Sequence, residues 1–136
     1  MAKEYGAVRE RTRIFGNGDV RSIAEAKQLA KKYGLDGVMI GRGIFGNPWL
    51  FDVARKGIPP EPKEKLRVLV EHTKLFEKMY TGIKRFDVMK KHFKAYVNGF
   101  DGAKELRIEL MGAKNAKQVA EIIKAKMAEG ELTNAR

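Results

Sequence analysis

A run of prolines, Ile58-Pro59-Pro60-Glu61-Pro62, limits how this 136-residue chain can fold. Proline fixes φ and has no backbone N–H, so a segment this rich in proline continues neither a helix nor a central strand. The sequence before the run is rich in glycine and short β-type segments, whereas the sequence after it shows long helical patterns. We therefore predict two units, residues 1–58 and 63–136, joined by a linker over residues 59–62.

Two short apolar segments in the first unit are typical of strands. The first is Arg13-Ile14-Phe15-Gly16, which stops at the turn residues Asn17-Gly18-Asp19. The second is Asp36-Gly37-Val38-Met39-Ile40-Gly41, which resembles a buried parallel strand and runs into Gly41-Arg42-Gly43. With a helix between them, the two segments predict a βαβ unit.

The helix between these strands carries signals at both ends. Ser22 with Glu25 three positions later is a capping box, and Gly34 is a typical C-terminal stop. These signals predict a helix over residues 23–33. Its spacing predicts one buried apolar face, made of Ile23, Ala26, Leu29 and Ala30.

Helical periodicity dominates the second unit. Helices are predicted over residues 63–80, along an apolar stripe from Phe86 to Phe100, over 103–111, and after a cap at Asn115. Short connections between them predict a small, mostly four-helix bundle, so the chain is predominantly helical overall. The expected core residues are Leu66, Leu69, Val70, Thr73, Phe76, Tyr80, Phe86, Met89, Phe93, Tyr96, Val97, Phe100, Val119, Ile122, Ile123 and Met127.

Composition narrows the classes of function. The formal net charge of +11 favours an anionic partner such as nucleic acid, although a merely solvated basic surface gives the same number. With no cysteine and two histidines, we predict no metal site. No apolar run reaches the roughly 18 residues of a membrane span, and the first residues lack a signal-peptide core. The expected location is cytoplasmic, with no membrane partner.

Two glycine-containing loops are candidates for phosphate binding. Asn17-Gly18-Asp19 and Gly41-Arg42-Gly43 each follow a predicted parallel strand, where ligands bind in α/β proteins. Their glycines expose backbone N–H groups, and Arg42 adds a guanidinium. The alternative is that these glycines only make tight turns. The Gly41–Gly46 spacing also fits a dinucleotide motif, but no long helix and second strand follow it.

A second candidate site is a basic face in the helical unit. Between residues 84 and 94 there is a single acid, Asp87, among basic residues, and Lys90 and Lys94 share a helix face. Such a face would contact phosphates without sequence preference. A solvated surface remains the alternative. The basic residues are Lys84, Arg85, Lys90, Lys91 and Lys94.

Several blocks of the sequence resemble the bacterial FMN-dependent tRNA-dihydrouridine synthases. They are Gly16-Asn17-Gly18-Asp19, residues 36–43, Gly46-Asn47-Pro48-Trp49-Leu50-Phe51, and Met89-Lys90-Lys91-His92-Phe93-Lys94-Ala95-Tyr96. They occur in the family's order and spacing, and the Asn-Pro-Trp-Leu-Phe continuation is the more specific part. The resemblance extends from about residue 14 onward.

The resemblance implies an α/β fold class, with the last βαβ unit of a TIM barrel followed by the helical bundle. It implies an oxidoreductase of tRNA processing, which reduces uridine to dihydrouridine with FMN as cofactor and NADPH as reductant. By the same match, the FMN phosphate lies against Asn17, Gly18, Asp19, Gly41 and Arg42. The helical unit would be RNA-binding, with Lys84, Arg85, Lys90, Lys91, His92, Lys94 and Arg107 as candidate tRNA contacts; packing against Tyr96 is an equal alternative for His92.

The sequence also departs from this family. The family's catalytic cysteine lies on an earlier strand, and this chain has no cysteine. No residue here matches the flavin-contacting lysine and histidine of the middle strands. We therefore expect no catalytic residue, no activity from the chain alone and no retained FMN. A missing N-terminal barrel portion is the expected partner, and open strand edges predict self-association.

Two alternatives to this flavoprotein fragment stay open. The chain is then either a freestanding RNA-binding module or a fragment of another FMN-dependent barrel oxidoreductase that acts on a small molecule. Dihydroorotate dehydrogenases, for example, carry similar glycine loops.

Overall fold

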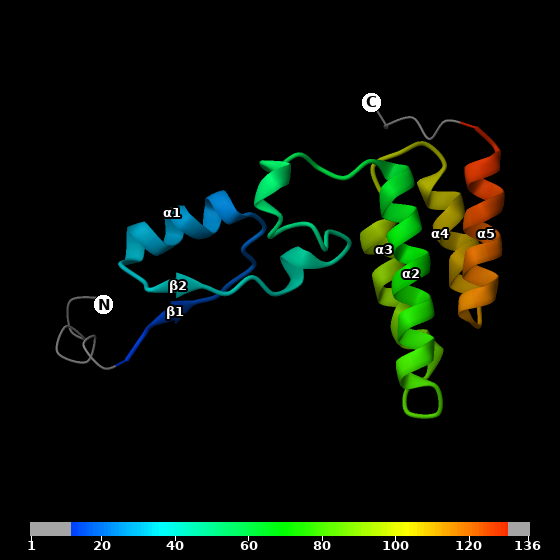
Figure 1. Cartoon of the computed structure of the whole chain (residues 1–136), viewed down its shortest axis with the longest axis horizontal. Coiled ribbons are helices and arrows are strands. Elements are labelled where there is room, and N and C mark those ends of the chain that lie inside the picture. Colours follow the sequence, from blue (N-terminus) through cyan, green and yellow to red (C-terminus); the bar gives the residue numbers. More distant parts are fainter. Residues whose placement is uncertain (1–11, 131–136) are drawn as a thin grey trace. The chain divides into compact units, whose positions relative to one another are not determined.

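The structure is a computed structural model that describes residues 12–130 (Figure 1). Within this range the chain divides into two compact units. Residues 12–44 and 48–57 form the first unit, whereas residues 45–47 and 58–130 form the second. The short segment Phe45–Asn47 therefore belongs to the helical unit although it interrupts the first unit in sequence.

The first unit has the predicted order of strand, helix and strand. Strands β1 (Phe15–Gly16) and β2 (Gly37–Val38) pair in parallel, with Phe15 opposite Gly37 and Gly16 opposite Val38. Helix α1 (Ile23–Tyr33) connects them and contacts β2. The parallel pairing and the connecting helix are confirmed.

Helix α1 begins and ends as its sequence predicts. The Ser22 hydroxyl accepts a hydrogen bond of 3.1 Å from the Glu25 N–H, and the Glu25 carboxylate accepts one of 2.9 Å from the Arg21 N–H. Gly34 ends the helix in the left-handed conformation, at φ 62°. These contacts satisfy backbone groups that a helix end leaves without partners.

Burial in the first unit is lower than we predicted. The apolar face of α1 was expected to be buried, but Ile23, Ala26, Leu29 and Ala30 are only half-buried, and so are both residues of β2. Within the described residues, α1 covers just the short β1–β2 pair, which offers little surface to pack against. The expectation of a buried second strand was therefore wrong for this structure.

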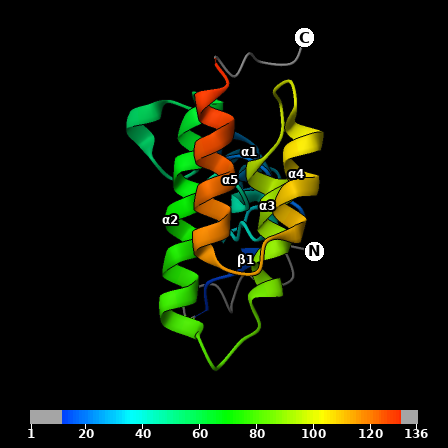
Figure 2. The same ribbon diagram turned by 90° about the vertical axis from the view of Figure 1, so that its right-hand side faces the viewer.

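The second unit contains the predicted helical segments. Its helices are α2 (Pro62–Tyr80), α3 (Lys90–Tyr96), α4 (Ala103–Gly112) and α5 (Ala116–Ala128), and a 3₁₀ turn over Phe86–Met89 leads into α3. Helix α2 packs against α5 and α3, and α4 packs against α3 and α5 (Figure 2).

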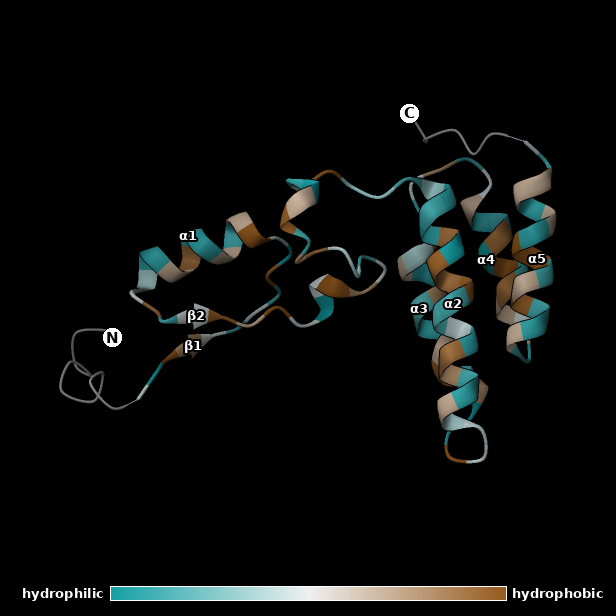
Figure 3. Cartoon of the chain, viewed as in Figure 1, coloured by the Kyte–Doolittle hydropathy of each residue, from teal (hydrophilic) through white to brown (hydrophobic). Residues whose placement is uncertain are grey.

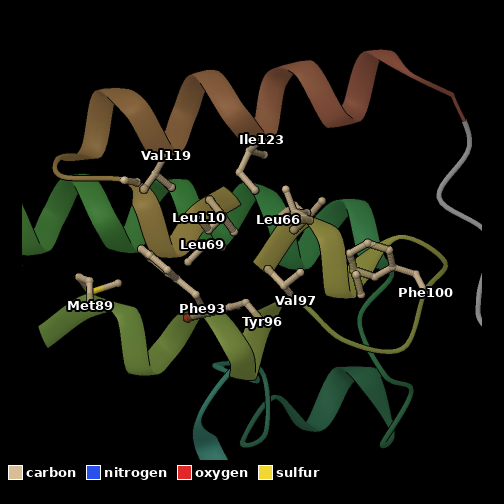
Figure 4. Close-up of a cluster of buried hydrophobic side chains, with 13 residues drawn as sticks. Leu66, Leu69, Met89, Phe93, Tyr96, Val97, Phe100, Leu110, Val119 and Ile123 are labelled. Atoms are coloured by element: carbon tan, nitrogen blue, oxygen red, sulfur yellow. The ribbon is translucent and has the colours of Figure 1, made fainter. Parts of the chain in front are cut away.

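The core of the second unit lies between these helices (Figure 4). In Figure 3, brown apolar stretches alternate with teal polar ones along α2 and α5, as expected for helices with one buried face. The buried Thr73 hydroxyl donates to the Leu69 carbonyl oxygen at 2.7 Å, so it leaves no unpaired polar group. The largest fully buried side chains are Phe93, Leu66, Leu69, Met89, Leu106, Leu110, Ile123, Val97, Val119 and Thr73.

Most of the predicted core is confirmed. Six of its members are only partly buried, and all of these except Tyr80 pack against the buried cluster: Val70, Phe76, Tyr80, Phe86, Ile122 and Met127.

The start of α5 is fixed by two side chains. The Asn115 side-chain oxygen accepts from the Gln118 N–H at 2.9 Å, which confirms the predicted cap. The Glu77 carboxylate of α2 accepts from the Ala116 N–H at 3.1 Å.

Among residues 12–130, no helix is both long and apolar enough to cross a membrane.

Candidate phosphate site and nucleic-acid interface

The two glycine-containing loops of the first unit meet at one pocket. All five residues predicted to hold a phosphate line it, together with apolar side chains from the end of β2 and with Phe51. The parallel pairing of β1 and β2 explains the meeting, because parallel strands bring their carboxyl ends to the same edge. The five residues are Asn17, Gly18, Asp19, Gly41 and Arg42.

The backbone of these loops is shaped to present N–H groups. Gly18 and Asp19 both have positive φ, 137° and 48°, a conformation that few residues adopt without a reason. The N–H groups of Gly18, Asp19 and Gly41 donate to no other described residue. They remain available to an anion at the strand ends.

Close packing holds the second loop against the chain that leads into α1. Residues Arg42–Ile44 form a 3₁₀ turn, and a Cβ atom on Gly43 would collide with the Val20 carbonyl oxygen. A residue larger than glycine would push this loop away. Gly43 thus brings Arg42 close to the first loop.

Arg42 forms an ion pair with Asp19 across the two loops, and both side chains are more than two-thirds exposed. Exposed pairs contribute about 0–1 kcal/mol, so the guanidinium can turn toward an anion at little cost. Arg21 lines a neighbouring pocket with Asp19, Arg42 and Gly43, which adds a second cation that we did not predict. Free N–H groups and guanidinium groups are the donors that a phosphate monoester requires, so these residues fit that group.

Phe51 is a further pocket residue that we missed. Its side chain is 57% exposed and lines the same pocket as the two loops. The turn that contains it is closed by a 2.9 Å hydrogen bond from the Asp52 N–H to the Trp49 carbonyl oxygen. The Arg55 guanidinium lies 4.8 Å from the centre of the Trp49 ring. The block that contains Phe51 was noted for its resemblance alone, and the exposed aromatic ring was the unused signal.

The segment Phe45–Asn47 docks on helix α3. Gly46 is buried at φ 72°, and a Cβ atom there would collide with the Ala95 carbonyl oxygen. The Phe45 ring meets the His92 ring edge-on, with centroids 5.0 Å apart. The Asn47 side-chain oxygen is buried and has no hydrogen-bond partner among the described residues.

His92 belongs to a cluster of rings. Its centroid lies 5.0 Å from that of His72, whose Nδ1 lies 3.2 Å from the Tyr96 hydroxyl oxygen. Burial lowers the pKa of both imidazoles, and the charges of His72 and Lys91 lower the pKa of His92 further. The histidine that pairs with Tyr96 is therefore His72, whereas His92 packs between Phe45 and His72.

Several of the predicted basic residues already contact other side chains of the helical unit. Lys90 is 22% exposed and pairs with Asp87 at 2.7 Å, and Arg85 pairs with the same carboxylate at 3.0 Å. Lys84 lies over the Tyr80 ring, 4.6 Å from its centre. By contrast, Lys91 and Lys94 are exposed.

Helices α3 and α4 form a groove with basic walls. Lys90, Lys91 and Lys94 line it from α3, and Lys104 and Arg107 line it from α4. The structure thus adds Lys104 to the predicted cations and places Arg107 beside them. Arg107 also donates to the Val97 carbonyl oxygen at 2.9 Å, which anchors its side chain.

The groove also has apolar lining from α4. Ile108 and Met111 line it and are 65% and 51% exposed, respectively. With Lys104 they recur at spacings of four and three residues, beside the buried stripe Ala103, Leu106 and Leu110. This second stripe was the signal that sequence reasoning left unused.

Among residues 12–130, no cluster of three or more His, Asp or Glu residues could hold a metal ion.

Comparison with known proteins places the chain in a family. The family model described as dihydrouridine synthase matches residues 6–131. A probable tRNA-dihydrouridine synthase of Staphylococcus aureus (strain Mu50) is 43% identical over 106 residues, which is 77% of this chain and 31% of that protein. The corresponding protein of Staphylococcus epidermidis (strain RP62A) is 41% identical over 108 residues, 79% of this chain and 32% of its own length.

A more distant relative matches the same share of the chain. The probable tRNA-dihydrouridine synthase 2 of Bacillus subtilis (strain 168) is 37% identical over 108 residues, 79% of this chain and 33% of that protein. The chain thus spans about a third of the length of these curated relatives. It belongs to the dihydrouridine synthase family.

Proposed function

We propose that this chain is the C-terminal part of an FMN-dependent tRNA-dihydrouridine synthase. The last βαβ unit of its TIM barrel holds the phosphate end of FMN, and its helical unit docks tRNA. The observation that carries the proposal is the convergence of Asn17, Gly18, Asp19, Gly41 and Arg42 on one pocket in a member of this family. FMN, when bound, supplies the hydride that reduces the uracil ring.

The residues of this chain bind and orient the cofactor rather than carry out the reduction. Backbone N–H groups of Gly18, Asp19 and Gly41 donate to the phosphate, and the Arg42 guanidinium neutralises it. The Asp19 carboxylate would repel a phosphate. Asp19 therefore contributes through its backbone N–H and through the ion pair that holds Arg42 in place. With no cysteine to donate a proton, the chain alone is inactive. With only half of the flavin site, it binds FMN too weakly to retain it.

The rest of the barrel is the proposed partner of the first unit. Phe15 and Met39, at the two strands, are 54% and 59% exposed, and further strands would cover such side chains. In their absence, the same exposed strands favour self-association.

A direct test compares FMN with riboflavin, which lacks the phosphate. In ¹⁵N NMR spectra of the whole chain, FMN should shift the amide resonances of Gly18, Asp19 and Gly41, and riboflavin should not. Arg42→Gln should abolish the shifts, whereas Arg13→Gln, an exposed arginine outside the pocket, should not. Equal shifts with both ligands would mean that these loops do not recognise the phosphate.

The tRNA role is tested by charge reversal on the exposed face of α3. Fluorescence anisotropy with labelled tRNA should show binding that weakens steeply with salt. Lys91→Glu with Lys94→Glu should abolish it. The matched control is Lys117→Glu with Lys124→Glu, which changes the same charge at exposed positions of α5. Equal effects of the two pairs would indicate attraction by net charge alone.

A freestanding RNA-binding module is the second candidate. It is favoured by the location of the buried core, which lies almost entirely in the helical unit of the described chain. The two candidates differ in the FMN experiment. A module of this kind binds tRNA, but FMN does not shift the amide resonances of its Gly18 and Gly41. FMN recognition without tRNA binding would instead favour a barrel oxidoreductase that acts on a small molecule.

A further inference from the structure

The groove between α3 and α4 combines two kinds of surface that a phosphate-binding face alone does not need. Its rim carries the cations Lys91, Lys94 and Lys104, which are exposed. Its remaining lining includes Ile108 and Met111, two large apolar side chains that are more than half exposed. Contacts with duplex phosphates use only the cations, so the apolar pair requires another explanation.

Helix α4 carries its buried, acidic and groove-lining side chains on different faces. Ala103, Leu106 and Leu110 are buried in the core. The Lys126 ammonium of α5 donates to the Glu129 carboxylate at 2.8 Å, which is the main cause of its raised pKa, and the charges of Glu109 and Glu105 of α4 raise that pKa further. The acids of α4 therefore lie toward α5, and the groove toward α3 is lined by cations and apolar groups without a carboxylate.

We propose that this groove binds an unstacked nucleotide of an RNA loop or single strand. The base packs on Ile108 and Met111, and the flanking phosphates contact Lys91, Lys94 and Lys104. This inference rests on the proposed tRNA-docking role and identifies the part of the RNA that the helical unit contacts.

The chemistry of the groove favours RNA over a protein partner. The face of an unstacked base is apolar and aromatic, and its two neighbouring phosphates are anionic, which matches a groove lined by both exposed apolar side chains and cations. Met111 suits an aromatic face, because a thioether is flexible and polarisable and makes favourable contacts with rings. The chain's net charge of +11 adds attraction for a polyanion.

The experiment compares an unstructured RNA strand with an RNA duplex of equal length. Ile108→Ser with Met111→Ser should weaken binding of the single strand about fivefold, the low end for loss of a base contact. Binding of the duplex and the salt dependence of both should not change. The matched control is Leu75→Ser with Met79→Ser, which removes an equally exposed apolar pair from α2 and should change neither.

Methyl NMR reads out the base contact directly. With ¹³C-methyl methionine, the Met111 resonance among the six methionines should move upfield when the single strand binds, because it enters the shielding region of a base. Inorganic pyrophosphate, which has the charge without the base, should leave it in place. Unchanged melting curves of the serine variants establish that they are folded.

The outcomes separate this inference from the proposed function. If the parent chain binds neither RNA, both fail. If it binds RNA but the serine pair has no effect on the single strand, or weakens single strand and duplex equally, the nucleotide groove is wrong and tRNA docking stands. Tighter binding of an acidic amphipathic peptide than of the single strand, lost in the serine pair, would also overturn it and assign the groove to a protein partner.

Discussion

The two units of this chain bury very different amounts of apolar surface. Among the described residues of the first unit, Val20 is the only buried hydrophobic side chain, and the apolar face of α1 stays half-buried. In the second unit, side chains from α2, α3, α4 and α5 pack into one cluster. Burial of apolar side chains is the main favourable term in folding, so we expect stability to lie in the second unit.

The two candidate binding surfaces therefore lie on units that we expect to differ in stability. The two loops proposed to bind phosphate lie on the unit with little core, and their conformation depends on local contacts such as the Ser22 cap and the close approach of Gly43 to Val20. The basic groove lies on helices that a core holds in place. The comparison predicts that the basic groove persists under conditions in which the two glycine-containing loops lose their structure.

Truncation of core side chains gives the largest expected effect. Phe93→Ala should lower the free energy of unfolding of the helical unit by about 3–5 kcal/mol, whereas Leu29→Ala in the half-buried face of α1 should cost the first unit less than about 2 kcal/mol. Urea titration followed by circular dichroism reports the helices. The fluorescence of Trp49, the single tryptophan, reports the first unit. Coincident transitions with both probes in every variant would show that the two units do not differ in stability.

Gly46→Ala tests the docking of Phe45–Asn47 on α3. The new methyl group would meet the Ala95 carbonyl oxygen, and alanine disfavours a positive φ, so we expect a loss of about 3 kcal/mol in the helical unit. Gly82→Ala, in the turn after α2, is the matched control in the same unit: its φ is 77°, but nothing lies within 4 Å of the added atom. It should cost about 1 kcal/mol, from the backbone conformation alone. Equal losses in thermal melts would show that the segment is not docked.

The helix caps offer a finer comparison of the units. Asn115→Ala and Ser22→Ala each remove a side-chain acceptor and should each cost about 1 kcal/mol. The Asn115 variant should shift the transition seen by circular dichroism. The Ser22 variant should shift the Trp49 fluorescence transition and the small α1 part of the circular dichroism signal, but not the main circular dichroism transition of the helical unit. A shift of that main transition together with the fluorescence transition by either variant would indicate that the units unfold as one.

The pH dependence should be the smallest effect and confined to the helical unit. Burial lowers the pKa values of His72 and His92 in the folded state, so the unfolded chain binds more protons as pH falls below about 6.5. The free energy of unfolding should therefore decline from that pH down to the folded pKa values. Tyr96 beside them has a raised pKa, above this window.

The measurement is a series of urea titrations between neutral and mildly acidic pH. His72→Gln should flatten the decline seen by circular dichroism. The lowered pKa of Asp87, held by Lys90 and Arg85, acts at lower pH and should not contribute. A decline that is equal in the parent and the variant would assign it to other groups.

Much of this molecule follows from local sequence. The capping pair Ser22 and Glu25 fixed the start of α1, and Asn115 fixed the start of α5, because a cap depends on residues a few positions apart. The helical stripes identified Leu66, Phe93 and other core residues for the same reason. The strand-end loops were predicted to converge because parallel strands end at one edge.

Other features depend on contacts between distant residues. The engagement of Lys90 and Arg85 by Asp87, the pairing of His72 with Tyr96, and the docking of Gly46 on Ala95 required folded geometry. The half-burial of α1 was missed because periodicity shows which face is apolar, but not how much surface covers it.

The sequence by itself determined the order of the strands and α-helices of the described chain, most of the core of the helical unit and which loops follow the two strands. Tertiary structure alone decided which cations face a groove. Lys84 and Arg85 carry the same charge and lie a few residues earlier in the chain, but the packing of α3 against α4 places Lys91 and Lys94, and not these two, beside Lys104, Ile108 and Met111. Helical periodicity gives the direction of each side chain from its own axis, whereas a groove depends on which axis lies next to it.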